Sequence, residues 1–227
     1  MRRRKILTGA AVAGAGAGAL AAYVLRVRPW HLRWGATDEE LRERLPGDEL
    51  VPSPNVEATH AVTVEAPVEE VWPWLVQMGQ DRGGFYSYTW LENLVGCRMR
   101  NAGRIIPEFQ QLQAGDAVRL HPKAPPLPVL ICEPPRALVL GSNTASPGTW
   151  GFYLKEVDED TTRLVIRGRG EWGRGLVNQL AARVVFEPAH FIMERKMLLG
   201  IKRRAETLRQ CLDKVSRRHV RVAGEQW

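Results

Sequence analysis

The pattern that most constrains the fold of this chain is an apolar stripe between residues 174 and 215, near the C-terminus. At about 100° per residue, its side chains fall within about 60° of Ile201. They are Met197, Leu198, Ala205, Leu208 and Leu212. This spacing predicts a long amphipathic helix, with one possible break at Pro188, because proline disrupts a helix interior. A helix with one apolar face must pack against another layer of structure.

Two ionisable residues, His190 and Glu194, lie on the same stripe. Both fall within about 20° of its centre by the helical period. Because a buried charge is costly unless it is paired, hydrogen-bonded or facing a polar cavity, the pair predicts an internal cavity. Glu194 could orient or deprotonate His190 and make it a general base. Alternatively the two form a satisfied core pair, or Glu194 binds an arginine of the sheet, for which the options are Arg119, Arg167 and Arg169.

Six shorter segments alternate between apolar and polar residues, the pattern of half-buried strands. They lie near residues 58–65, 118–120, 127–132, 137–140, 150–154 and 164–166. Most are joined by short turns and should therefore pair antiparallel. A helical segment with Val71, Trp72 and Leu75 on one face follows the first strand. These elements predict an α+β fold in which the long helix covers the apolar face of one sheet.

The last predicted strand carries three arginines on one face, Arg163, Arg167 and Arg169. They alternate with the apolar residues Leu164 and Ile166. We therefore expect the arginines on the solvent face of the sheet.

A long insertion without a strand pattern spans residues 80–114. Insertions of this length are usually functional or mobile. Its aromatic residues are Phe85, Tyr86, Tyr88 and Trp90. They could line the mouth of a cavity, with a tyrosine hydroxyl as a polar contact, or they could pin the insertion to the body of the domain.

The N-terminal 35 residues hold seven basic side chains and no acidic one, whereas the remainder of the chain is neutral as a whole. Residues 6–25 are uncharged, nearly all apolar, and numerous enough for a helix to cross a bilayer. This pattern predicts a single-pass membrane anchor flanked by basic residues. Export is the alternative, because residues 3–7 resemble a twin-arginine signal and residues 19–21 a small-residue cleavage site. A disordered arm is the third interpretation.

These patterns divide the chain into four parts. They are the basic N-terminus with the anchor or signal (1–35), a short helix and linker (36–55), the folded domain (56–216) and a basic tail (217–227). The second part opens with a predicted capping box between Thr37 and Glu40. The basic clusters of the whole chain lie near its termini and are not interleaved with aromatic residues on a folded face, so no nucleic-acid partner is expected.

The chain from residue 51 to 215 resembles the SRPBCC superfamily, the START-related and polyketide cyclase/dehydrase-like proteins. The resemblance is carried by residues 64–72 (Val-Glu-Ala-Pro-Val-Glu-Glu-Val-Trp), 133–138 (Glu-Pro-Pro-Arg-Ala-Leu) and the Gly-Gly-Phe-Tyr-Ser-Tyr insertion at 83–88. It implies a helix-grip fold, in which a curved antiparallel sheet of about six strands wraps around the terminal helix and leaves an apolar cavity. The superfamily shares no catalytic set, so the resemblance transfers no catalytic residue to this chain.

The expected function is the binding of a small hydrophobic molecule or lipid at a membrane face, in preference to catalysis. The expected ligand-binding residues are Phe85, Tyr86, Tyr88, Trp90, Trp150, Phe152, His190, Glu194 and Met197. One alternative is a cyclase/dehydrase-like enzyme with His190 and Glu194 as acid and base and Tyr86 as helper. The other is an interaction module with a closed cavity. The sequence shows no metal-ligand spacing and no cofactor fingerprint, and it does not indicate an oligomeric state.

Overall fold

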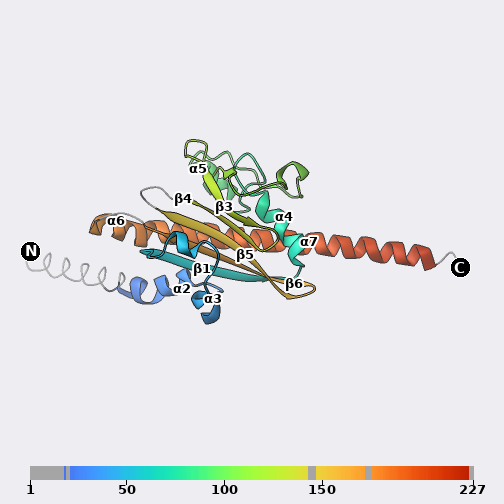
Figure 1. Cartoon of the computed structure of the whole chain (residues 1–227), viewed down its shortest axis with the longest axis horizontal. Coiled ribbons are helices and arrows are strands. Elements are labelled where there is room, and N and C mark those ends of the chain that lie inside the picture. The colour runs from blue at the N-terminus through green and yellow to red at the C-terminus, as the bar shows by residue number, and fades with distance from the viewer. Residues whose placement is uncertain (1–17, 19–20, 143–146, 172–174, 225–227) are drawn as a thin grey trace, which may run out of the picture.

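The computed structural model describes residues 18, 21–142, 147–171 and 175–224, without the side chains of 176–177 and 215–224. Within them the chain forms the predicted α+β architecture, a six-stranded antiparallel sheet with a long C-terminal helix along one face (Figure 1). The sheet order is β1-β6-β5-β4-β3-β2. The strands are β1 (Val56–Val64), β2 (Ala117–Val118), β3 (Leu127–Glu133), β4 (Ala137–Ser142), β5 (Gly148–Asp158) and β6 (Thr161–Gly170).

The described helices precede, interrupt and follow the sheet. They are η1 (Tyr23–Val27), α2 (Arg28–Leu32), α3 (Asp38–Arg42), η2 (Asp48–Leu50), α4 (Val68–Val76), α5 (Thr89–Leu94), η3 (Pro107–Phe109), α6 (Leu176–Ala181), η4 (Ala182–Phe186) and α7 (Glu187–Gly224). α3 begins at the predicted capping box, in which Thr37 and Glu40 each accept a hydrogen bond from the other's backbone amide.

The main core lies between α7, α4 and one face of the sheet. Leu198, Ile201 and Ala205 of α7 are fully buried, as the apolar stripe predicts. They belong to one apolar cluster with Phe152 and Ile166 of the central strands. Further along the stripe, Leu212 is largely exposed, because α7 continues past the edge of the sheet (Figure 1).

Pro188 does not break the terminal helix. α6, η4 and α7 follow one another without a gap, and η4 is a π-helical turn placed directly before Glu187 and Pro188. Proline lacks an amide hydrogen and crowds the preceding turn, which here is π-helical, so the helix passes Pro188 without a break.

The opposite face of the sheet is covered by the segment that contains α3 and η2. There Arg167 is only 2% exposed, and it donates to the Asp48 carboxylate at 2.8 Å and to the Glu43 carbonyl at 2.8 Å. Tyr153 donates to the carbonyl of Pro46 at 2.7 Å. The prediction of a solvated arginine face is therefore wrong, because alternation shows which side chains share a face but not what covers that face.

The membrane localisation predicted from residues 6–25 is contradicted. No helix in the described part of the chain is long and apolar enough to cross a membrane. Most of the predicted span, like the twin-arginine-like residues 3–7, lies outside the described residues. The described end of the span packs on the folded domain instead: Tyr23 donates to the carbonyl of Arg183 at 2.6 Å.

Candidate ligand-binding cavity

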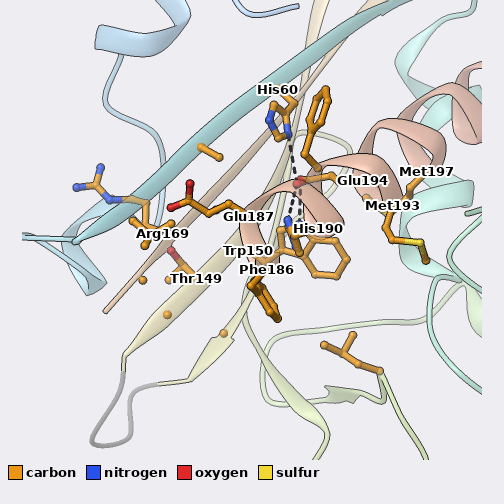
Figure 2. Close-up of a pocket in the computed structure, with 18 of the residues that line it drawn as sticks. His60, Thr149, Trp150, Arg169, Phe186, Glu187, His190, Met193, Glu194 and Met197 are labelled. Atoms are coloured by element: carbon orange, nitrogen blue, oxygen red, sulfur yellow. Dashed lines mark hydrogen bonds and ion pairs between the residues drawn. The ribbon is translucent and has the colours of Figure 1, made fainter. Parts of the chain in front are cut away.

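A cavity of about 450 Å³ lies between the first turns of α7 and the sheet, with α2 and the insertion also contributing to its wall (Figure 2). Part of the sheet wall is built from glycine, including Gly148, Gly168 and Gly170. Gly168 pairs with Ala58 on one side and Trp150 on the other. A Cβ atom added at Gly168 would meet no atom within 4 Å. Because these glycines have no side chains, the sheet leaves open the space that larger residues would fill in a packed core.

Much of the remaining wall is aromatic or aliphatic. Trp150 lies centrally, with its ring centroid 5.9 Å from that of Phe85 and 6.2 Å from that of His190. Phe191 and Met197 line the cavity from α7. A wall of this kind excludes water and favours an apolar occupant.

Glu194 stands at the centre of the polar part of the wall and is only 3% exposed. Its Oε2 atom lies 3.2 Å from Nδ1 of His60 and 3.2 Å from Nδ1 of His190 (Figure 2). Its Oε1 atom accepts a hydrogen bond from the indole nitrogen of Trp150 at 3.2 Å. Three side chains from β1, β5 and α7 therefore converge on one buried carboxylate.

Electrostatics favour an ion pair within this cluster. Burial alone would raise the pKa of Glu194, but the charge and hydrogen bond of His190, together with His60, hold that pKa well below its usual range. Burial would lower the pKa of His190, but the charge and hydrogen bond of Glu194 raise it above its ordinary value. The contact therefore favours an ionised Glu194 beside a protonated His190.

His60 adds a constraint on where protons reside. Its Nε2 atom lies 2.7 Å from the carbonyl oxygen of His31, which can only accept, so Nε2 carries a hydrogen. Its Nδ1 atom faces Oε2 of Glu194 and has no other partner among the described residues.

Further titratable groups line the cavity around this cluster. Glu187 is held by Arg28 through two hydrogen bonds of 2.8 and 2.9 Å, which neutralise its charge. Burial lowers the pKa of His31 and raises the pKa of Glu92, so both side chains favour their neutral forms. No group of three or more His, Cys, Asp or Glu side chains in the described ranges could hold a metal ion.

The structure brings together five of the nine residues expected to bind ligand. Phe85, Trp150, His190, Glu194 and Met197 line the cavity. The sheet arginines do not bind Glu194, because Arg167 and Arg169 pair with Asp48 instead.

The other four expected residues lie elsewhere. Tyr86 is buried in the core, where its hydroxyl donates to the Trp74 carbonyl and accepts from Gln77, so it is not placed to assist catalysis in the cavity. Phe152 is fully buried in the core. Tyr88 packs under the ammonium group of Lys196, and Trp90 is 67% exposed on the surface of α5. These four belong to the core or the surface rather than to the cavity wall.

Several residues that line the cavity or support its wall were not among the expected ligand-binding residues. The sequence pattern indicated some of them more clearly than others. His60 alternates with Val62 and Val64 along the first strand, so the two-residue period did place it on the core face. Arg28 and His31 lie in residues 1–35, whose pattern predicted a basic N-terminus with a membrane anchor or export signal. Their partners are far away in the sequence, and no local periodicity reports such contacts.

Comparisons with known proteins add no family assignment. No protein-family model matches the chain, and no curated protein matches its sequence. Among solved structures, the hypothetical protein jhp0584 from Helicobacter pylori is 13% identical, with 71% of this chain and 95% of that chain covered and a TM-score of 0.46. The protein KanY is 10% identical (66% and 97% covered, TM-score 0.43), and Ms6760 from Mycobacterium smegmatis is 11% identical (69% and 92% covered, TM-score 0.38). Likenesses at this level carry no argument about function.

Proposed function

We propose that this chain binds a small, mainly apolar molecule in the cavity between the sheet and α7. The single observation that carries the proposal is the cavity itself, about 450 Å³ in volume and walled by glycine and aromatic residues. This volume lies within the range of small-molecule sites, which are mostly apolar and carry a few placed polar groups. The arrangement of sheet and terminal helix also supports the SRPBCC resemblance.

Binding is favoured over general-base catalysis by the state of the buried pair. A general base needs a free lone pair near neutral pH. Glu194 raises the pKa of His190, which shifts the imidazole toward the protonated form and away from the neutral form that a base requires. A protonated His190 is suited to hold a ligand by hydrogen bonding.

The proposal is tested by filling the cavity from its sheet wall. Gly168→Leu places a side chain in open space at the cavity wall, so the fold should persist while the cavity shrinks. Gly103→Leu is the matched control, because Gly103 is an exposed loop residue that also has no atom within 4 Å of an added Cβ. The probe is N-phenyl-1-naphthylamine, a neutral apolar dye whose fluorescence rises when it leaves water.

We expect the wild-type protein and Gly103→Leu to bind the dye with the same affinity, and Gly168→Leu to bind it at least about tenfold more weakly. Circular dichroism checks that all three proteins are folded. Equal dye binding by wild type and a folded Gly168→Leu, or no binding by wild type, would overturn the proposal.

A further inference from the structure

We propose that the natural ligand carries an acidic oxygen, as a hydrophobic carboxylate or phenolate does, and that His190 is the residue that recognises it. This inference rests on the proposed function and specifies the ligand class of the same cavity. It follows from the geometry of the imidazole, the charges around it and the apolar wall beside it.

The two ring nitrogens of His190 have different roles. Nδ1 lies 3.2 Å from Glu194, which fixes the ring and its orientation. Nε2 has no hydrogen-bond partner among the described residues, and 37% of the side chain is exposed although its partner Glu194 is buried. With Nδ1 engaged by a carboxylate, Nε2–H remains as a donor that a ligand can reach.

The other charges of the cavity do not cancel this donor. Glu187 is paired with Arg28, and Arg169 is paired with Asp48 and Glu57. Burial raises the pKa of Glu92 and lowers the pKa of His31, so it shifts both groups toward their neutral forms. Glu194 is already shared by His190, His60 and Trp150. An anionic oxygen beside Nε2 therefore meets a charged donor whose own carboxylate partner is already engaged, while the ligand body contacts the apolar wall.

A matched pair of probes separates this inference from the proposed function. 2-Naphthoate and 2-naphthamide have the same ring and nearly the same size, but only the first carries a negative charge. Isothermal titration calorimetry at pH 7.5 gives the ratio of their affinities for each protein. The wild-type protein should prefer the carboxylate by at least about tenfold, which is the effect of a hydrogen bond between charged partners.

Two variants assign that preference to His190. His190→Gln keeps a neutral donor, and Glu194→Gln removes the carboxylate that keeps His190 protonated. In both, the ratio of carboxylate affinity to amide affinity should fall to within about threefold. The second variant keeps the test decisive if His190→Gln fails to fold.

The inference is overturned if the wild-type protein binds the carboxylate no more tightly than the amide, including the case in which it binds neither. It is also overturned if the preference survives in both folded variants. Binding of N-phenyl-1-naphthylamine that is lost in Gly168→Leu would still uphold the proposed function in either case, so the two failures are distinguishable.

Discussion

His60 in the first strand and Glu194 in the last helix lie 3.2 Å apart, Nδ1 to Oε2, and both are almost fully buried. The other nitrogen of the same imidazole donates to the carbonyl of His31 at the end of α2. One histidine therefore joins β1, α2 and α7 at the wall of the cavity. The carboxylate that holds it should be a main determinant of stability as well as of binding.

Removing that carboxylate should be strongly destabilising. Glu194→Ala leaves His60, His190 and the Trp150 indole without their shared acceptor, and we expect a loss of about 3–5 kcal/mol in the free energy of unfolding. Glu194→Gln keeps one acceptor oxygen and should cost less, about 1–2 kcal/mol. Urea denaturation at pH 6 measures both.

Glu206→Ala on the same helix is the control for that comparison. Glu206 pairs with Lys202 and accepts a hydrogen bond from the Glu65 amide at 3.0 Å, so its loss should cost about 1–2 kcal/mol. A cost for Glu194→Ala no larger than that for Glu206→Ala would show that the buried cluster does not stabilise the fold.

The stabilisation from His190 should depend on pH in a defined direction. Although burial opposes its charge, the adjacent Glu194 raises its pKa above the ordinary 6.5, so the folded chain holds this proton more tightly than the unfolded chain. The contribution is therefore fully present below about pH 6.5 and is lost as the pH rises through the raised pKa. The depressed pKa of Glu194 gives a contribution that is present above its ordinary value of 4.5 and is lost as the pH falls.

The measurement for this pH prediction is urea denaturation of wild type and His190→Gln between pH 4.5 and pH 9. Their difference in unfolding free energy should be largest between about pH 4.5 and 6.5 and should shrink at higher pH. His31 has a lowered pKa and contributes with the opposite sign, but it is present in both proteins and cancels in the difference. A difference that grows with rising pH would contradict the assignment of a charged His190.

Local periodicity explains which parts of this site could be predicted. The helical period places Glu194 on the core face of the last helix, and the two-residue period of the strands predicts the sheet. His60 was accessible to the same reasoning through Val62 and Val64. The contact between His60 and Glu194 was not, because the register of a strand against a distant helix is set by three-dimensional packing.

The remaining differences also have physical causes. Tyr86 has a left-handed backbone conformation with φ of 58°, and its side chain lies in the core rather than in the cavity wall. Residues other than glycine rarely adopt this backbone conformation. No pattern in the sequence indicated it. The apolar run before Arg28 resembled a membrane anchor by composition alone. Composition does not indicate that Arg28 pairs with the buried carboxylate of Glu187 on α7.

The pair of Arg28 and Glu187 should fasten α2 over the cavity. Arg28→Met leaves the Glu187 carboxylate buried without its partner, and we expect a loss of about 3–5 kcal/mol in unfolding free energy. The double variant Arg28→Met/Glu187→Met removes both charges and should be more stable than Arg28→Met. A double-mutant cycle by urea denaturation measures the coupling, and a double variant less stable than the single one would refute the pairing.

Gly200 should be required where α7 passes the insertion. A Cβ atom there would lie 2.4 Å from the carbonyl oxygen of Tyr86, which belongs to the backbone and has little freedom to move. We expect Gly200→Ala to destabilise the protein by about 1–3 kcal/mol. Gly103→Ala, where an added Cβ meets nothing within 4 Å, should be within about 0.5 kcal/mol of wild type in the same thermal or urea melt. Equal stability of the two variants would mean that the helix and the insertion are not in contact as described.

Native mass spectrometry of protein purified without detergent tests the central claim most directly. After incubation with N-phenyl-1-naphthylamine, the wild-type chain should carry one equivalent of the dye. An endogenous small molecule bound before incubation should be displaced by the dye. Gly168→Leu should carry neither molecule. Wild-type protein that stays free of any small molecule, or a cavity-filled variant that binds as much dye as wild type, would contradict the account.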